Sequence, residues 1–231
     1  MRNLCDYFYK LEKKIITVIG SGGKTSLILL LAEQSCGKKV LVTTTTRMYI
    51  PKEMKGVCVA GKLNEKSGKL ESLPLNELEE SSSRFDLVLI EGDGSRELPF
   101  KAWAEWEPVV PPWTDLSIGI IPLWPLGMAA SGRLIHRPLL FSDLTGIREG
   151  ETIKPEHIAA AISGLRAGKY GRGLFTAAAG MKILFFNQIE DEKEMQKAGE
   201  IVALLPAEFR SGLHSIVAGS VKKNRLDILW E

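Results

Sequence analysis

The most constraining feature of the sequence is a glycine-rich stretch at residues 13–26, which reads KKIITVIGSGGKTS. An apolar run typical of a buried strand is followed by clustered glycines and then by the apolar residues 27–32, so the pattern predicts a strand, a loop and a helix. Backbone N–H groups in such a loop and at the helix N-terminus form an anion site. We expect this phosphate-binding loop to consist of Gly20, Ser21, Gly22, Gly23, Lys24, Thr25 and Ser26.

Two side chains of this loop suit a nucleotide and its metal ion. Lys24 would reach the outer phosphates, and the Thr25 hydroxyl would hold Mg²⁺. The spacing is the short form G-x-x-G-K-T, because the more common pattern has a further glycine where this chain has Val18. The alternative is a glycine turn that only joins a strand to a helix. The Lys–Thr pair directly after the last glycine favours phosphate binding.

The second informative stretch is FDLVLIEGDGS at residues 85–95, where a continuous apolar strand runs into two carboxylates. Carboxylates at the end of a buried strand can hold Mg²⁺ or polarise an attacking group. We expect Lys24, Glu91 and Asp93 to act in catalysis, and Thr25, Glu91 and Asp93 to bind the metal. Taken alone, the pattern is equally consistent with an acidic turn, but its pairing with the glycine loop favours function.

A run of four threonines follows the apolar residues 40–42, which are typical of a strand buried on both faces of a parallel sheet. Ligands of open parallel sheets bind at the carboxyl edge, so a hydroxyl of residues 43–46, with Thr44 and Thr45 as the main candidates, could contact a phosphate or a metal-bound water. A strand end made of β-branched residues is an equally good interpretation. These patterns predict an α/β fold like that of P-loop NTPases, with a mostly parallel sheet and helices on both faces.

Residues 99–138 differ in composition from the rest, since they hold seven of the 11 prolines and four of the five tryptophans. We expect an irregular segment across the top of the sheet, with one further buried strand at residues 116–121. The tryptophans could form a lid or a partner surface, although core filling is favoured. Basic groups at Arg133, His136 and Arg137 would meet an anionic substrate or form a solvated turn.

Composition limits the class of protein. The 231 residues suffice for one α/β domain over 1–231, and 30 basic residues nearly balance 28 acidic ones, so nucleic acid is not the expected partner. Three cysteines without C-x-x-C spacing favour neither zinc nor a disulfide framework. No apolar run is long enough to span a bilayer or resembles a signal peptide. We expect a soluble, cytoplasmic protein.

Several of these segments together resemble the YqeC family, which is associated with the maturation of selenium-dependent molybdenum hydroxylases. The resemblance rests on GSGGKTS (20–26), TTTTRM (43–48), EGDGSR (91–96), LPFKA (98–102), EPVVPP (107–112) and HRP (136–138). It implies a nucleotide-binding P-loop protein with Mg²⁺ and ATP or GTP, and a molybdenum hydroxylase or its cofactor-synthesis proteins as partners. Arg96 and Lys101 belong to these motifs, and we expect them to contact the substrate with Arg133, His136 and Arg137.

The segment NQIE at residues 187–190 resembles the guanine-recognition motif N-K-x-D, so Asn187 and Glu190 are candidate base contacts. Gln188 replaces the lysine and Glu190 the aspartate, so the resemblance does not decide between ATP and GTP. Residues 166–173 form a basic, glycine-rich loop that would contact phosphate or serve as a flexible connection.

Three functions are consistent with these residues. The first is Mg²⁺-dependent NTP hydrolysis coupled to maturation of a molybdenum hydroxylase or its cofactor. The second is a kinase or ATP-dependent ligase that acts on a small anionic metabolite. The third is a non-catalytic module that binds a nucleotide or a molybdenum cofactor carrying one.

Overall fold

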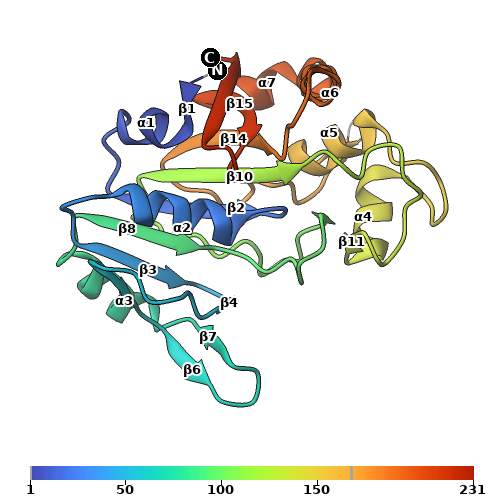
Figure 1. The fold of residues 1–231 in the computed structure, drawn as a ribbon. Helices are drawn as coiled ribbons and strands as arrows, with labels where there is room; N and C mark the ends of the chain where they lie inside the picture. Colours follow the sequence, from blue (N-terminus) through green and yellow to red (C-terminus); the bar gives the residue numbers. More distant parts are fainter. Residues whose placement is uncertain (1, 167–168) are drawn as a thin grey trace.

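The computed structural model describes residues 2–166 and 169–231 and is organised around a nine-stranded sheet with the order β1-β16-β15-β14-β10-β2-β8-β3-β5 (Figure 1). From β5 to β15 all neighbouring strands pair in parallel, whereas β16 pairs antiparallel with both β15 and β1. The mostly parallel sheet is therefore confirmed. The strands of this sheet are β1 (Arg2–Asn3), β2 (Ile15–Gly20), β3 (Val40–Thr44), β5 (Val57–Val59), β8 (Leu87–Glu91), β10 (Leu116–Pro122), β14 (Met181–Asn187), β15 (Ser215–Ser220) and β16 (Arg225–Trp230).

The central strands form because their sequences are continuous apolar runs that can be buried on both faces. Every residue of β3, β8, β10 and β15 is buried. The strand expected at residues 116–121 is β10, which lies between β2 and β14 in the sheet. Although it belongs to the proline-rich segment, it is therefore one of the central strands of the fold.

Helices cover both faces of the sheet, as the sequence predicted. Apolar side chains of α1 (Leu4–Tyr9) and α2 (Lys24–Gln34) pack on one face. The other face is covered mainly by α4 (Pro138–Thr145), α5 (Pro155–Ser163) and α6 (Glu192–Leu204), with α3 (Leu75–Ser82) near the β3 edge. A short helix, α7 (Ala207–Ser211), precedes β15.

Smaller strands lie outside the main sheet. The strands β4 (Arg47–Tyr49), β6 (Lys62–Asn64) and β7 (Lys69–Glu71) form an antiparallel sheet that projects below β3 in Figure 1. Two further pairs are β9 (Phe100–Lys101) with β11 (Ile135–His136), and β12 (Leu165–Arg166) with β13 (Lys169–Tyr170). In the part of the chain that the structure describes, none of the helices combines the length and apolar character needed to cross a bilayer.

The tryptophans of the proline-rich segment do not share one environment. Trp103 is buried with 4% of its surface exposed, in agreement with a core-filling role, but Trp106 is 70% exposed. The expectation that the aromatic cluster fills the core is therefore wrong for Trp106. The physical reason is its position: Trp106 lies on a loop that leaves the sheet after β9, and it lines a pocket.

Candidate functional site

The candidate site lies at the carboxyl edge of the sheet, where β2 leads into the glycine loop. Strand order places β8 directly beside β2, and their register pairs Val18 with Glu91. The carboxylates that follow β8 therefore lie beside the loop that follows β2. This is the edge at which parallel α/β sheets bind their ligands.

The glycine loop has a backbone conformation that requires glycine. Gly20 has φ +99°, and a Cβ there would lie 2.3 Å from the carbonyl oxygen of Ile120. Gly23 has φ +129°, and its Cβ would lie 2.4 Å from the side-chain amide nitrogen of Asn187. The glycines thus let the loop curl tightly against β10 and β14.

The curled loop leaves a row of backbone donors available. The amides of Gly22, Gly23, Lys24, Thr25 and Ser26 donate to no backbone or side-chain acceptor among the described residues. They form the end of the loop and the first turn of α2, where the helix dipole also favours negative charge. Such a row of N–H groups is suited to an anion with several oxygens, such as a di- or triphosphate.

Lys24 folds back over the loop. Its ammonium group donates to the carbonyl oxygen of Gly20 at 2.8 Å and lies 3.4 Å from Asp93, and the residue is only 5% exposed. The positive charge is therefore held inside the curl of the loop, next to the row of free amides.

Thr25 and Glu91 form a direct pair across the site. The Thr25 hydroxyl donates to Glu91 Oε2 at 2.6 Å. Burial raises the pKa of Glu91 above its usual range, although Lys24 and the Thr25 hydroxyl act in the opposite direction. Within the described residues no group of three or more His, Cys, Asp or Glu side chains is placed to hold a metal ion. The pair suits Mg²⁺, which usually takes one or two protein oxygens and fills its shell with phosphate and water.

Asp93 is placed differently from the metal ligand that the sequence predicted. It is fully buried, and its two oxygens accept from the Gly20 amide, the Trp103 indole at 2.9 Å and Lys101 at 3.1 Å, with Lys24 nearby. These contacts use the acceptor positions of the carboxylate. Burial alone would raise the pKa of Asp93, but Lys24 and Lys101 lower it below its usual range. Asp93 therefore anchors the glycine loop in this structure, and its role as a metal ligand stays a prediction.

Lys101 also differs from expectation, because it cannot reach a substrate. Its ammonium group is buried and bonds to Asp93, to the Gly94 carbonyl at 2.6 Å and to Glu107 at 3.0 Å, which uses its three donors. Glu107 also accepts from Arg137 at 2.5 Å. We call Asp93, Lys101, Glu107 and Arg137 the buried charge cluster. It connects the glycine loop to the pocket beside Trp106.

The threonine run mainly fixes the backbone. The hydroxyls of Thr43, Thr44 and Thr45 donate to the carbonyl oxygens of Ala60, Glu91 and Val109 at 2.6–2.9 Å. The Thr46 hydroxyl oxygen, by contrast, is buried and has no hydrogen-bond partner among the described residues. Thr44 and Thr45, the predicted phosphate contacts, thus act as strand-end hydrogen-bond donors, and Thr46 is the member of the run whose hydroxyl is available to a ligand.

Asn187 and Glu190 have protein partners in place of a base. The Asn187 amide donates to the Gly22 carbonyl at 2.9 Å and its oxygen accepts from the Val221 amide at 3.0 Å, so Asn187 ties the glycine loop to the end of β15. Glu190 accepts from the Ser220 hydroxyl at 2.9 Å and forms an ion pair with Lys223. Asn187 is the last residue of β14 and Glu190 lies on the loop after it; the contacts seen here are structural, and base recognition by them stays a prediction.

The remaining candidate substrate contacts are dispersed. Arg133 and Arg96 are exposed, and Arg96 has a left-handed φ of +51°. His136 on β11 lies beside Lys101 on β9. Burial and the nearby charges of Arg137, Lys101 and Arg96 lower the pKa of His136 to about 4, so it is neutral at pH 7. In the basic loop expected at residues 166–173, residues 167–168 lie outside the described part of the chain, and its phosphate contact stays a prediction.

Three residues important to this site were missed by reasoning from sequence alone. The Trp103 indole donates to Asp93 itself, and Glu107 accepts from Lys101, which also bonds to Asp93. Arg172 donates to the Glu107 carbonyl at 2.9 Å. The available signal was that Glu107 begins a motif carrying the family resemblance, and an acidic residue in a proline-rich segment needs a buried partner. Arg172 lies in the basic loop expected at residues 166–173, but no local pattern indicated its bond to Glu107, which is 65 positions away.

Comparisons with known proteins identify the family. The model of a family described as YqeC protein matches residues 16–139, which is more than half of the chain. The uncharacterized protein YqeC of Escherichia coli (strain K12) is 32% identical over an alignment of 173 positions, and the match covers 64% of this chain and 67% of that protein. No solved structure matches the chain significantly. The family match includes the glycine loop, both carboxylates after β8 and the buried charge cluster, and we conclude that this chain belongs to the YqeC family.

Proposed function

We propose that this protein binds a nucleoside triphosphate with Mg²⁺ in its glycine loop and hydrolyses it. The observation that carries the proposal is the row of unpartnered amides at residues 22–26, which surrounds the charge of Lys24 and adjoins the Thr25–Glu91 pair. Donors for phosphate, a neutralising cation and oxygen ligands for a metal ion are thereby brought within one turn of helix.

The proposed roles follow from these contacts. The amides hold the β- and γ-phosphates, and Lys24 exchanges its bond to the Gly20 carbonyl for phosphate oxygens, where it neutralises charge in the transition state. Thr25 and Glu91 would hold Mg²⁺ through their side-chain oxygens, and Glu91 would accept a hydrogen bond from the attacking water. A bound Mg²⁺ supplies charge neutralisation. Asp93 positions the loop through the Gly20 amide and does not contact the nucleotide.

The biological setting follows from the family resemblance and is part of the proposal. It places the hydrolysis in the maturation of a molybdenum hydroxylase, including selenium-dependent forms, or of its cofactor. In that setting the nucleotide reaction is coupled to a partner, so turnover by the protein alone is slow. Either ATP or GTP is accommodated by a loop that contacts phosphates, and the base preference depends on the loop after β14.

The experiment is phosphate release with Mg²⁺ and either ATP or GTP, measured together with nucleotide binding by calorimetry. Lys24→Ala should abolish release and weaken binding at least tenfold, because it removes the cation at the phosphates. Lys66→Ala, on the exposed hairpin between β6 and β7, is the matched control and should behave as the wild type. Normal turnover by Lys24→Ala, or absence of nucleotide binding by the wild type, would overturn the proposal.

A second function is favoured by one specific observation, the pocket of about 800 Å³ beside Trp106. A pocket of this size could hold the acceptor of a kinase or ligase. This alternative predicts that nucleotide turnover stays near background until a small anionic acceptor is added. A mass-spectrometric screen that yields no phosphorylated or ligated product, while hydrolysis proceeds, would count against it.

A further inference from the structure

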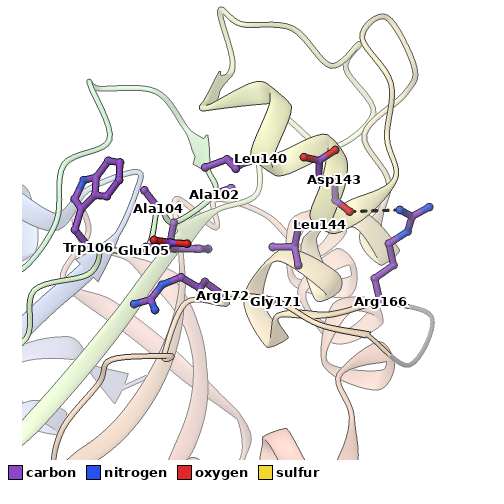
Figure 2. Close-up of a pocket in the computed structure, with 11 residues that line it drawn as sticks. Ala102, Ala104, Glu105, Trp106, Leu140, Asp143, Leu144, Arg166, Gly171 and Arg172 are labelled. Carbon is purple, nitrogen blue, oxygen red and sulfur yellow. Dashed lines mark hydrogen bonds between the residues drawn. The ribbon is translucent and has the colours of Figure 1, made fainter.

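We propose that the pocket beside Trp106 is a second ligand site, which binds a small molecule with a flat heteroaromatic ring and an anionic group. The pocket encloses about 800 Å³ between the loop after β9, helix α4 and the chain around Arg172 (Figure 2). The residues that carry the argument are Trp103, Trp106, Leu140, Leu144, Arg166 and Arg172. The proposal concerns a site separate from the glycine loop and does not depend on nucleotide binding.

The size and walls of the pocket suit a flat apolar ring. Figure 2 shows Trp106 and Leu144 on opposite sides of the pocket. Trp106 leaves 70% of its surface exposed, and Leu140 leaves 41% exposed, although both could have been buried in a layer this rich in apolar residues. An indole face, with the Arg137 guanidinium 6.0 Å from its centre, is a stacking surface for an electron-poor ring. The volume lies in the range of pockets that hold one small molecule.

The charges around the pocket favour an anion at its inner end. Arg172 donates to the Glu107 backbone carbonyl through Nε and Nη2, a neutral partner that leaves its positive charge uncompensated. The Glu107 carboxylate is already shared between Lys101 and Arg137. The Asp93 carboxylate is likewise shared between Lys24 and Lys101. Lys24 belongs to the glycine loop, where the buried Glu91 also faces it, so Arg172 is the member of this set that lines the pocket and can bind a carboxylate or phosphate of a ligand.

The acidic residues of the pocket lie where they would select ring donors. Glu105 and Asp143 both line the pocket and are exposed to solvent at its rim. They are placed to accept hydrogen bonds from N–H or amino groups, which are common on heteroaromatic rings. The pocket thus offers an apolar face, outer acceptors and an inner cation.

The test uses 1-naphthyl phosphate as the probe, with 1-naphthol and inorganic phosphate as partial probes, each titrated calorimetrically into the full-length protein. We expect 1-naphthyl phosphate to bind at sub-millimolar concentration. Trp106→Ala should weaken it about five- to tenfold through lost stacking, whereas Trp124→Ala, which removes another exposed indole outside the pocket, should not. Arg172→Gln should weaken 1-naphthyl phosphate but leave 1-naphthol unchanged.

A further variant separates this site from the glycine loop. Lys24→Ala should leave binding of 1-naphthyl phosphate intact, because Lys24 lies in the loop and not in the pocket. Binding that is lost in Lys24→Ala and kept in Trp106→Ala would mean that the phosphate enters the glycine loop, and would overturn the proposal. The proposal would also be overturned if the wild type did not bind the probe, or if Trp106→Ala and Arg172→Gln both bound it as tightly as the wild type. Since Trp106 is exposed, its replacement should not impair folding, and a thermal melt checks this.

Discussion

The Thr25–Glu91 pair and the buried charge cluster each include a carboxylate from the carboxyl end of β8, but the surroundings of these two carboxylates differ. Glu91 is the last residue of β8 and accepts one hydrogen bond from a loop hydroxyl. Asp93, two residues later, lies in the interior between two lysines and an indole. Carboxylates so close in sequence therefore separate into one that pairs with the Thr25 hydroxyl and one that holds the loop in place. Their separation shows that strand-end acidic motifs must be interpreted through their partners.

The largest effect is expected from Asp93→Ala. Removing this carboxylate takes a buried counter-charge from Lys24 and one of the two carboxylates that pair with Lys101, which should lower the free energy of unfolding by roughly 3–5 kcal/mol. Urea denaturation measures this, with the exposed Glu79→Ala on α3 as a matched control that should stay near the wild type. If Asp93→Ala were as stable as the control and lost only turnover, Asp93 would be a metal ligand after all and the comparison would fail.

A companion variant sharpens this result. The double change Asp93→Asn with Lys101→Met replaces both members of the buried pair by neutral groups of similar volume. It should recover part of the stability that Asp93→Ala loses, because no isolated charge remains in the interior. A double variant less stable than the sum of the single changes would contradict the buried-pair interpretation.

Glu91→Gln should affect turnover far more than stability. If Glu91 accepts from a metal-bound or attacking water, its loss should reduce Mg²⁺-dependent turnover roughly 100- to 1,000-fold, in the range of other positioned catalytic groups. The free energy of unfolding should change by less than about 1 kcal/mol, since glutamine can keep the bond to Thr25. Glu190→Gln removes the charge of a more exposed carboxylate and serves as the control, which should turn over like the wild type. A Glu91→Gln protein that unfolds easily but turns over normally would reverse the two roles.

The sequence predicted the glycine loop and the Thr25–Glu91 pair far better than the buried charge cluster. The glycine loop, β8 and the parallel sheet follow from contiguous apolar runs and glycines, whose effects are local. The sequence also indicated that Thr25 and Glu91 would meet, because the carboxyl ends of parallel strands share an edge. The sequence did not distinguish Glu91 from Asp93, because the pattern suggested that both carboxylates were exposed to a ligand.

The buried charge cluster could not be predicted, because its contacts depend on where distant segments cross. Lys101 was expected to contact substrate, but β9 lies inside the molecule, where its ammonium group must find carboxylates. The bond from Arg172 to the Glu107 carbonyl likewise joins residues far apart in sequence. Trp103 and Trp106 lie three positions apart, but Trp103 packs in the core and donates to Asp93, whereas Trp106 is exposed.

Asn187→Ala should have a smaller effect than Asp93→Ala, and it should act by loosening the glycine loop. It removes the hydrogen bonds to the Gly22 carbonyl and the Val221 amide, so the free energy of unfolding should fall by about 1–3 kcal/mol. Nucleotide affinity should weaken by the same factor for ATP and GTP, because the loop and not the base contact is disturbed. Calorimetry with both nucleotides measures this. Asn64→Ala, which removes one amide bond in the outer hairpin, should leave both affinities unchanged. A selective loss of GTP would show that Asn187 contacts the base.

The smallest effect is expected from His136, beside the buried charge cluster. Its pKa is lowered from 6.5 to about 4 by burial and by the charges of Arg137, Lys101 and Arg96, against a weaker opposite effect of Glu107. The unfolded chain therefore binds this proton more readily, and stability must fall as the pH drops from about 6.5 towards 4. His136→Asn should flatten that part of the profile by on the order of 1 kcal/mol, once solvent screening is allowed for. Urea denaturation at pH 7 and pH 5 measures the difference. Identical slopes for both proteins would mean that His136 is too well solvated to sense the cluster, whose cations would then act only on Asp93 and Glu107.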